Sequence, residues 1–134
     1  MKNNTLYYDV IGGIIYLKVV LRGIGGDNVD KEIMKGSIDI LLLSIINRHD
    51  AYGYEIAKCI KEKSNDIYSM GEGTLYPALK RLESKEFIES YWEKSSLVGR
   101  RKYYRITELG NKILKEKIDN WNNVTRLINM FKGE

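Results

Sequence analysis

The sequence of 134 residues contains one cysteine, Cys59, and one histidine, His49. A single cysteine excludes an internal disulfide and is typical of a protein in the reducing cytoplasm. These two residues are also too few for a zinc site of the usual histidine and cysteine type. Cys59 lies in an apolar-periodic run, so we expect a half-buried structural thiol, and His49 lies among polar residues and is expected to face water. The sequence therefore predicts a cytoplasmic protein with no metal and no cofactor.

Long apolar runs and catalytic residue sets are also missing. No stretch approaches the roughly 20 consecutive apolar residues that a membrane-spanning helix needs. No Ser/His/Asp or Cys/His catalytic set can be recognised, and Gly71-Glu72-Gly73 is too short to be a phosphate-binding loop. With 30% charged and 43% hydrophobic residues, the composition is that of a globular chain. We therefore expect neither a membrane protein nor an enzyme.

Positive charge is modest in amount but concentrated in one place. The formal net charge is +4. Between Lys94 and Arg105, however, the chain has five basic residues and no acidic one. A surface segment of this kind attracts polyanions through Coulomb steering and counterion release. A basic turn that is merely solvated is the alternative interpretation.

Residues 1–30 differ in pattern from the rest of the chain. The stretch from Val10 to Leu21 is rich in Val, Ile and Tyr, which favours a strand, and glycines lie at both of its ends. Two interpretations are open for this extension. It is a strand or arm that docks on the domain or on a partner, or residues 1–28 are an upstream leader read as coding sequence. For the second interpretation, Gly25-Gly26-Asp27-Asn28 can be encoded by a purine-rich run like a bacterial ribosome-binding site, with Val29 as the start.

Two helices are predicted first in the remaining chain. Apolar and small residues at helical spacing predict a strongly apolar helix over Ile33 to Arg48, which should run through the centre of the domain. The residues of this predicted stripe are Ile33, Ser37, Ile40, Leu41, Ser44 and Ile45. A second helix starts at Tyr52-Gly53-Tyr54, with Ile56, Ala57 and Ile60 on one face, and ends at Ser64-Asn65-Asp66.

A third helix follows a glycine-bearing turn. Thr74 is expected to be its N-cap and Pro77 to lie in its first turn, where the missing N–H costs little. Leu75, Leu79 and Leu82 are spaced four and three apart and predict the buried stripe. The residues left wholly or partly outward are Thr74, Tyr76, Pro77, Lys80, Arg81 and Ser84. Two short helices with a tight turn between them predict a helix-turn-helix.

Two strands and a long helix complete the predicted fold. The runs Phe87–Glu93 and Arg101–Thr107 predict a hairpin, which beside a helix-turn-helix is a wing, and Trp92 is expected to pack against the domain body. Thr107 should cap a last helix that extends to about Phe131. The predicted fold class is mainly α with a small β-hairpin, a winged helix-turn-helix over residues 31–107 followed by a C-terminal helix over residues 108–134.

The last helix has more apolar surface than one small domain can cover. Its apolar residues recur at steps of three and four over roughly six turns; they are Leu109, Ile113, Leu114, Ile118, Trp121, Val124, Leu127, Ile128 and Phe131. We therefore predict that this helix forms a two-fold homodimer, which suits two half-sites of a palindromic DNA operator.

Residues 31–134 resemble the short, single-domain members of the PadR family of bacterial transcriptional regulators. Four ordered blocks carry the resemblance: Lys35–Leu43, Tyr52–Ile56, Gly73–Glu83 and Gly99–Thr107. The resemblance implies a dimeric winged-helix repressor whose third helix reads the major groove and whose wing contacts phosphates. Drug-sensing members are similar in carrying a tryptophan on the C-terminal helix, which implies an aromatic effector at Trp121 with Ile118 and Val124. The alternative is that Trp121 is only a dimer-core residue.

The residues expected to bind double-stranded DNA come from both parts of the winged helix. They are Tyr52, Tyr54, Thr74, Tyr76, Pro77, Lys80, Arg81, Lys94, Arg100, Arg101 and Lys102. Helix residues are expected to contact bases and wing residues to hold phosphates. The rival function is a winged helix that only binds proteins, with the basic wing facing acidic partners.

Overall fold

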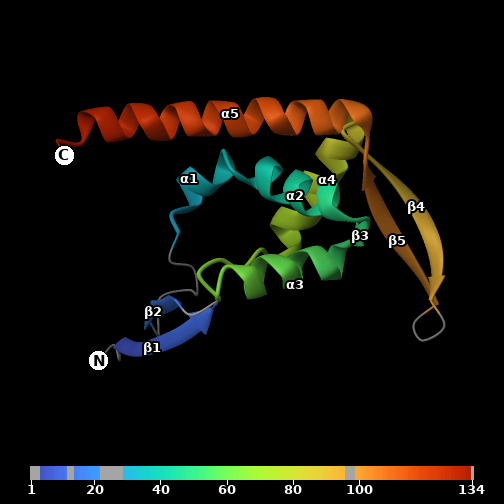
Figure 1. The fold of residues 1–134 in the computed structure, drawn as a ribbon. Helices are drawn as coiled ribbons and strands as arrows, with labels where there is room; N and C mark the ends of the chain where they lie inside the picture. The colour runs from blue at the N-terminus through green and yellow to red at the C-terminus, as the bar shows by residue number, and fades with distance from the viewer. Residues whose placement is uncertain (1–3, 12–13, 22–28, 96–98, 134) are drawn as a thin grey trace.

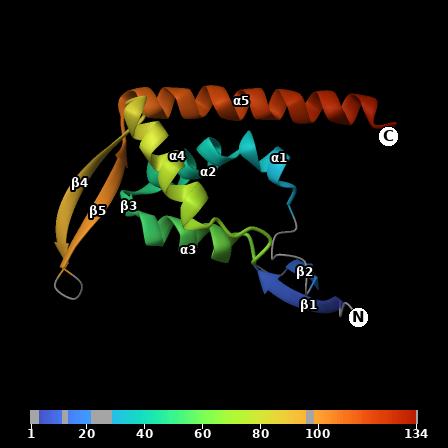
Figure 2. The same ribbon diagram turned by 180° about the vertical axis from the view of Figure 1, so that it is seen from behind.

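Five helices and a three-stranded antiparallel sheet, with a separate two-stranded hairpin, make up the part of the chain that the structure describes (Figure 1 and Figure 2). The computed structural model describes residues 4–11, 14–21, 29–95 and 99–133. In chain order the elements are β1 (Asn4–Ile11), β2 (Ile14–Leu21), α1 (Lys31–Lys35), α2 (Ile38–Arg48), β3 (Ala51–Tyr52), α3 (Gly53–Lys63), α4 (Glu72–Ser84), β4 (Ile88–Ser95), β5 (Gly99–Ile106) and α5 (Glu108–Phe131).

The helix-turn-helix is formed by α3 and α4, and β4 and β5 form the wing. The wing strands pair antiparallel, with Trp92 opposite Lys102. A third strand, β3, pairs with β5 through Ala51 opposite Tyr104; it was not predicted, because two residues are too few for a sequence pattern. Figure 1 shows the wing projecting away from the helices, with α5 running above α1 and α2. The predicted fold class, a winged helix-turn-helix followed by a long helix, is confirmed.

The core lies between α2, α3 and α4 and is closed by the sheet. Its largest fully buried side chains are Leu42, Leu43, Ile46, Ile56, Leu75, Leu79, Leu82 and Ile88. The predicted leucine stripe of the third helix is therefore confirmed. Each such side chain contributes about 1.5–3 kcal/mol on burial. These leucines fix the rotation of α4 and so determine which of its residues face outward.

The predicted helix over 33–48 is wrong in one respect, because it is broken into α1 and α2. Gly36 ends α1 and Ser37 is the N-cap of α2. The predicted stripe is also not the most buried face: Ile33 is 59% exposed, whereas Leu42 and Leu43 are fully buried. The physical reason is that α2 is covered on several faces, so apolar residues occur all around it. Their spacing alone could not identify the most buried face.

The third helix begins earlier than predicted. Gly71 is the N-cap of α4, so Thr74 lies inside the first turn and is not the cap. The carbonyl of Gly71 accepts bonds from the N–H groups of Thr74 and Leu75 at 3.1 and 2.9 Å. Pro77 accordingly lies in the second turn, where it removes one helical hydrogen bond. The helix starts early because Glu72 and Gly73 are already helical. No side-chain cap marks its first turn.

The expected strand over 10–21 is divided into two. β1 ends at Ile11 and β2 begins at Ile14, and they pair antiparallel as a two-stranded sheet of their own. Gly12 and Gly13 lie outside the described residues.

The long helix α5 begins where it was predicted to begin. The Thr107 hydroxyl accepts from the Gly110 N–H at 2.9 Å, which confirms Thr107 as the cap. The same hydroxyl donates to the Glu86 carbonyl at 2.7 Å, with the Phe87 carbonyl 3.1 Å away, and the Thr107 N–H donates to the Phe87 carbonyl at 3.0 Å. Gly110 is buried against this carbonyl, where a Cβ would lie 1.9 Å from the oxygen. The start of α5 is therefore packed directly on the backbone that leads into β4.

The two halves of α5 have different surroundings. In the first half, Leu114 is buried and Asn111 donates to the side chain of Asn47 on α2 at 2.6 Å. From Ile118 to Phe131 every residue is exposed. Both views show this half extending beyond the rest of the helices (Figure 1 and Figure 2).

Candidate nucleic-acid interface

A shallow hollow of about 690 Å³ lies between the helix-turn-helix and the wing. It is lined by Tyr52, Gly53, Tyr54, Tyr76, Trp92, Arg101, Lys102 and Tyr104. Five of these eight were predicted as DNA-binding residues, so the structure brings part of the predicted set together. The hollow combines aromatic rings with two cations, groups that suit a polyanion with planar bases.

The outer face of α4 presents the predicted helix residues. Thr74, Tyr76, Pro77, Lys80 and Arg81 are all exposed. Tyr76 is 47% exposed, and its ring packs against Gly53 at the start of α3. An added Cβ at Gly53 would lie 2.7 Å from the Tyr76 hydroxyl oxygen. The missing side chain at position 53 therefore sets the direction in which Tyr76 points.

Arg81 differs from its neighbours because its charge has a partner. Its guanidinium donates to a carboxylate oxygen of Asp39 on α2 at 2.6 Å. Lys117 on α5 lies 4.0 Å from the other oxygen of the same carboxylate. Arg81 thus links α4 to α2, whereas Lys80 has no ion-pair partner among the described residues. Of these two, Lys80 is the cation on α4 that is free to meet a phosphate or a base.

The wing cations lie over aromatic rings. The Arg101 guanidinium is 4.4 Å from the centre of the Tyr52 ring, and Arg100 is 5.3 Å from that of Trp92. Lys102 lies 5.6 Å from the Tyr104 ring and 3.8 Å from a carboxylate oxygen of Glu83. Cation–π contacts of this kind hold a long side chain in place while its charge stays exposed. Lys94 is exposed, opposite Arg100 in the wing.

The position of Trp92 differs from the one predicted from the sequence. The residue is 57% exposed and is not buried against the domain body. The reason is that the wing projects beyond the helices (Figure 1). Trp92 instead lies beside Arg100 and lines the hollow. The alternation of the strand places Trp92 on the same face as Lys94. It does not indicate on which side of the wing the domain body lies.

A ladder of rings on the other face of the wing was missed by sequence reasoning. Tyr103 lies edge-on to Tyr52 at 5.4 Å and stacks on Tyr91 at 5.7 Å, and Arg105 covers Tyr91 at 5.0 Å. The Tyr91 hydroxyl donates to Asp50 at 2.5 Å, and this bond, more than partial desolvation, raises the pKa of Tyr91 to about 12. The ladder fixes Tyr52, the ring beneath Arg101.

The predicted effector residues lie on the exposed half of α5. Ile118, Trp121 and Val124 are 37%, 43% and 51% exposed. None of them lines the hollow beside the wing. No described residues gather as a group of three or more His, Cys, Asp or Glu that could hold a metal ion. Within the described part of the chain, no helix has the length and apolar character needed to cross a membrane.

Comparison with known proteins places this geometry in a family. The model of the transcriptional regulator PadR-like family matches residues 42–116, more than half of the chain. The chain is 42% identical over 103 residues to an uncharacterized protein, protein X, of Lysinibacillus sphaericus, covering 77% of this chain and 94% of that one.

Solved structures agree with this match. A transcriptional regulator of Clostridium thermocellum has a TM-score of 0.71 and 39% identity, over 76% of this chain and 99% of that one. A PadR family transcription regulator of Clostridium difficile has a TM-score of 0.64 and 45% identity, over 72% and 99%. The helix-turn-helix, the wing and the long terminal helix of this chain are thus those of a known group of regulators, and the chain belongs to the PadR-like family of transcriptional regulators.

Proposed function

We propose that the protein is a homodimeric repressor that binds a palindromic DNA operator through α4 and the wing. The observation that carries this proposal is the hollow that is lined both by Tyr76 of α4 and by Arg101 of the wing. Tyr76 and Lys80 face outward from a helix of the size that fits a major groove. Arg100, Arg101 and Lys102 follow the wing beside it and suit a phosphate backbone.

The dimer is proposed from the exposed half of α5. Its exposed apolar side chains include Leu127, Ile128 and Phe131, which are 55%, 58% and 80% exposed. A continuous apolar stripe of this kind on a soluble protein marks an interface. A two-fold pair of such helices places two reading surfaces on one side of the dimer, as two half-sites require.

A mobility-shift experiment with DNA from upstream of the protein's own gene tests this function. We expect a complex whose affinity falls steeply with salt, and sedimentation equilibrium of the free protein should give the mass of two chains. The rival function, a winged helix that binds only proteins, predicts no shift at any salt concentration. A shift that is independent of salt would also contradict the proposal, because phosphate contacts release counterions.

Gly53→Ala should weaken operator binding by roughly fivefold to tenfold, about 1 kcal/mol, with little change in stability. The new Cβ must displace the Tyr76 ring, which is the far end of a flexible side chain, so the fold accommodates it. In a Tyr76→Ala background the same substitution should have no further effect on binding. An equal loss in both backgrounds would show that Gly53 acts independently of Tyr76.

We further propose that a flat aromatic ligand binds between the two Trp121 side chains of the dimer and releases DNA. Such a ligand can act only if it favours one separation of the half-sites over another. Titration with a flat cationic aromatic compound should quench indole fluorescence in the wild type. Quenching should fall in Trp121→Ala, which retains Trp92 as an internal control. Equal quenching in the two proteins would leave Trp121 as a dimer-core residue only.

A further inference from the structure

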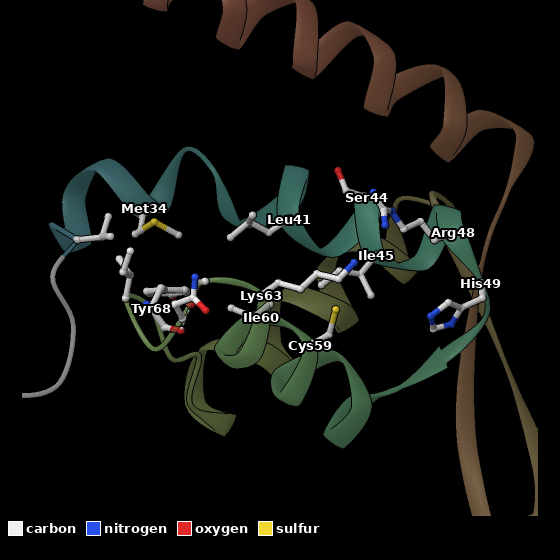
Figure 3. A pocket seen from close by; sticks show the side chains of 14 residues that line it. Met34, Leu41, Ser44, Ile45, Arg48, His49, Cys59, Ile60, Lys63 and Tyr68 are labelled. Carbon is white, nitrogen blue, oxygen red and sulfur yellow. Dashed lines mark hydrogen bonds between the residues drawn. The ribbon is translucent and has the colours of Figure 1, made fainter. Parts of the chain in front are cut away.

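A second hollow, of about 570 Å³, opens between α2 and α3, and no residue of the wing lines it. Its apolar walls are formed mainly by Met34, Leu41, Ile45, Cys59, Ile60 and Tyr68 (Figure 3). None of the residues that line it belongs to α5, so this site is distinct from the one proposed at Trp121. Its volume lies within the roughly 300–1,000 Å³ of small-molecule sites.

The charges around this hollow have one sign. Arg48 at the end of α2 and Lys63 at the end of α3 both line it, and His49 lies beside Arg48. Figure 3 shows Lys63 reaching from α3 across the opening toward α2. No aspartate or glutamate lines the hollow, and neither Arg48 nor Lys63 has an ion-pair partner within the described residues. The site therefore offers apolar walls below and uncompensated cations at the rim.

A second copy of the chain is a poor occupant. The apolar stripe that α5 leaves exposed would cover the walls, but the stretch from Ile118 to Phe131 carries one acidic residue, Asp119, and one basic residue, Arg126. That segment has no net negative charge to offset Arg48 and Lys63. A small molecule with an apolar body and a single negative head satisfies both the walls and the rim, because a carboxylate accepts charge-assisted hydrogen bonds from arginine and lysine.

We propose that the hollow between α2 and α3 is a binding site for an apolar monocarboxylate, such as a fatty acid. The body of the ligand lies against Leu41, Ile45 and Ile60, and its carboxylate lies at the rim between Arg48 and Lys63. The site lies outside the DNA-reading surface and outside the dimer helix, so it exists whether or not the proposed DNA binding is correct.

Calorimetry with laurate, in the absence of DNA, tests the site directly. The wild type should bind laurate below its micelle concentration and should not bind dodecyltrimethylammonium, which has the same tail with a positive head. Lys63→Glu and Arg48→Glu should each weaken laurate binding by roughly tenfold. The matched control is Lys61→Glu, the same charge change at an exposed position of α3 that does not line the hollow; it should bind laurate like the wild type.

The single cysteine provides an independent readout of where the ligand lies. Cys59 lines the hollow, so saturating laurate should slow its alkylation by iodoacetamide, followed by mass spectrometry, in the wild type and in Lys61→Glu. Equal laurate affinity in Lys63→Glu and Lys61→Glu would overturn the proposal. Unchanged alkylation of Cys59, or equal binding of the cationic analogue, would also overturn it. If laurate does not bind and alkylation of Cys59 rises when the protein is diluted, a second copy of the chain covers the hollow and the proposal is wrong.

Discussion

Gly110→Ala is expected to lower the free energy of unfolding by about 3 kcal/mol or more. An added Cβ would lie 1.9 Å from the Phe87 carbonyl oxygen and 2.8 Å from its carbon. Both of these atoms belong to the backbone, so no side-chain rotation relieves the clash. The first turn of α5 would have to move away from the start of β4, and the bonds that Thr107 donates to the Glu86 and Phe87 carbonyls would be lost.

Urea denaturation followed by circular dichroism measures this effect, with Gly73→Ala as the control. Gly73 lies inside α4 and has nothing within 4 Å of an added Cβ. That substitution should be neutral or should raise stability by roughly 0.5–1 kcal/mol, because alanine favours a helix over glycine. If the two variants unfold at the same urea concentration, the close packing of α5 on β4 does not contribute to stability as described.

Removal of the three wing cations should weaken binding to every DNA sequence by at least about a hundredfold at low salt. The variant is Arg100→Ala, Arg101→Ala and Lys102→Ala together. Loss of three phosphate contacts should also reduce the slope of log affinity against log salt concentration. The magnitude of this slope should fall by about 2–3 for each bound protomer. Discrimination between the operator and unrelated DNA should be retained, because Tyr76 and Lys80 on α4 are unchanged.

The control for the wing variant removes the same charge elsewhere. Lys112, Lys115 and Lys132 are exposed on α5 and just after it, away from the wing. Their joint replacement by alanine lowers the net charge by the same amount and should change affinity and salt slope far less. Binding isotherms by fluorescence anisotropy over a range of salt concentrations measure both quantities. Equal losses in the two variants would mean that net charge, and not the wing, attracts the DNA.

Local pattern predicted most of the secondary structure. Leu75, Leu79 and Leu82 repeat at helical spacing, and Thr107 is a capping residue before an amphipathic run, so α4 and α5 could be placed from neighbours in the sequence. The wing strands were predicted for the same reason. The break at Gly36 was not predicted, because the apolar pattern continues through it and one glycine costs a helix only about 1 kcal/mol.

Part of the candidate site could also be predicted, and part could not. Outward positions on α4 follow from its buried leucines, and the wing cations follow from the basic run. The partner of Arg81, by contrast, is Asp39, which lies 42 residues away in the sequence. Trp92, Tyr103 and the Tyr91–Asp50 bond were missed because each depends on which side of the wing the helices lie.

The sequence by itself determined the kind of protein: a winged helix-turn-helix with a basic wing and an amphipathic last helix, similar to PadR regulators. These features rest on periodicity, capping and charge, which are properties of residues close together in the chain. Only the tertiary structure decided that Gly53 directs Tyr76, that Arg81 is paired, and that α2 and α3 leave a hollow rimmed by Arg48 and Lys63. Those facts depend on contacts between distant segments, whose distances no local pattern encodes.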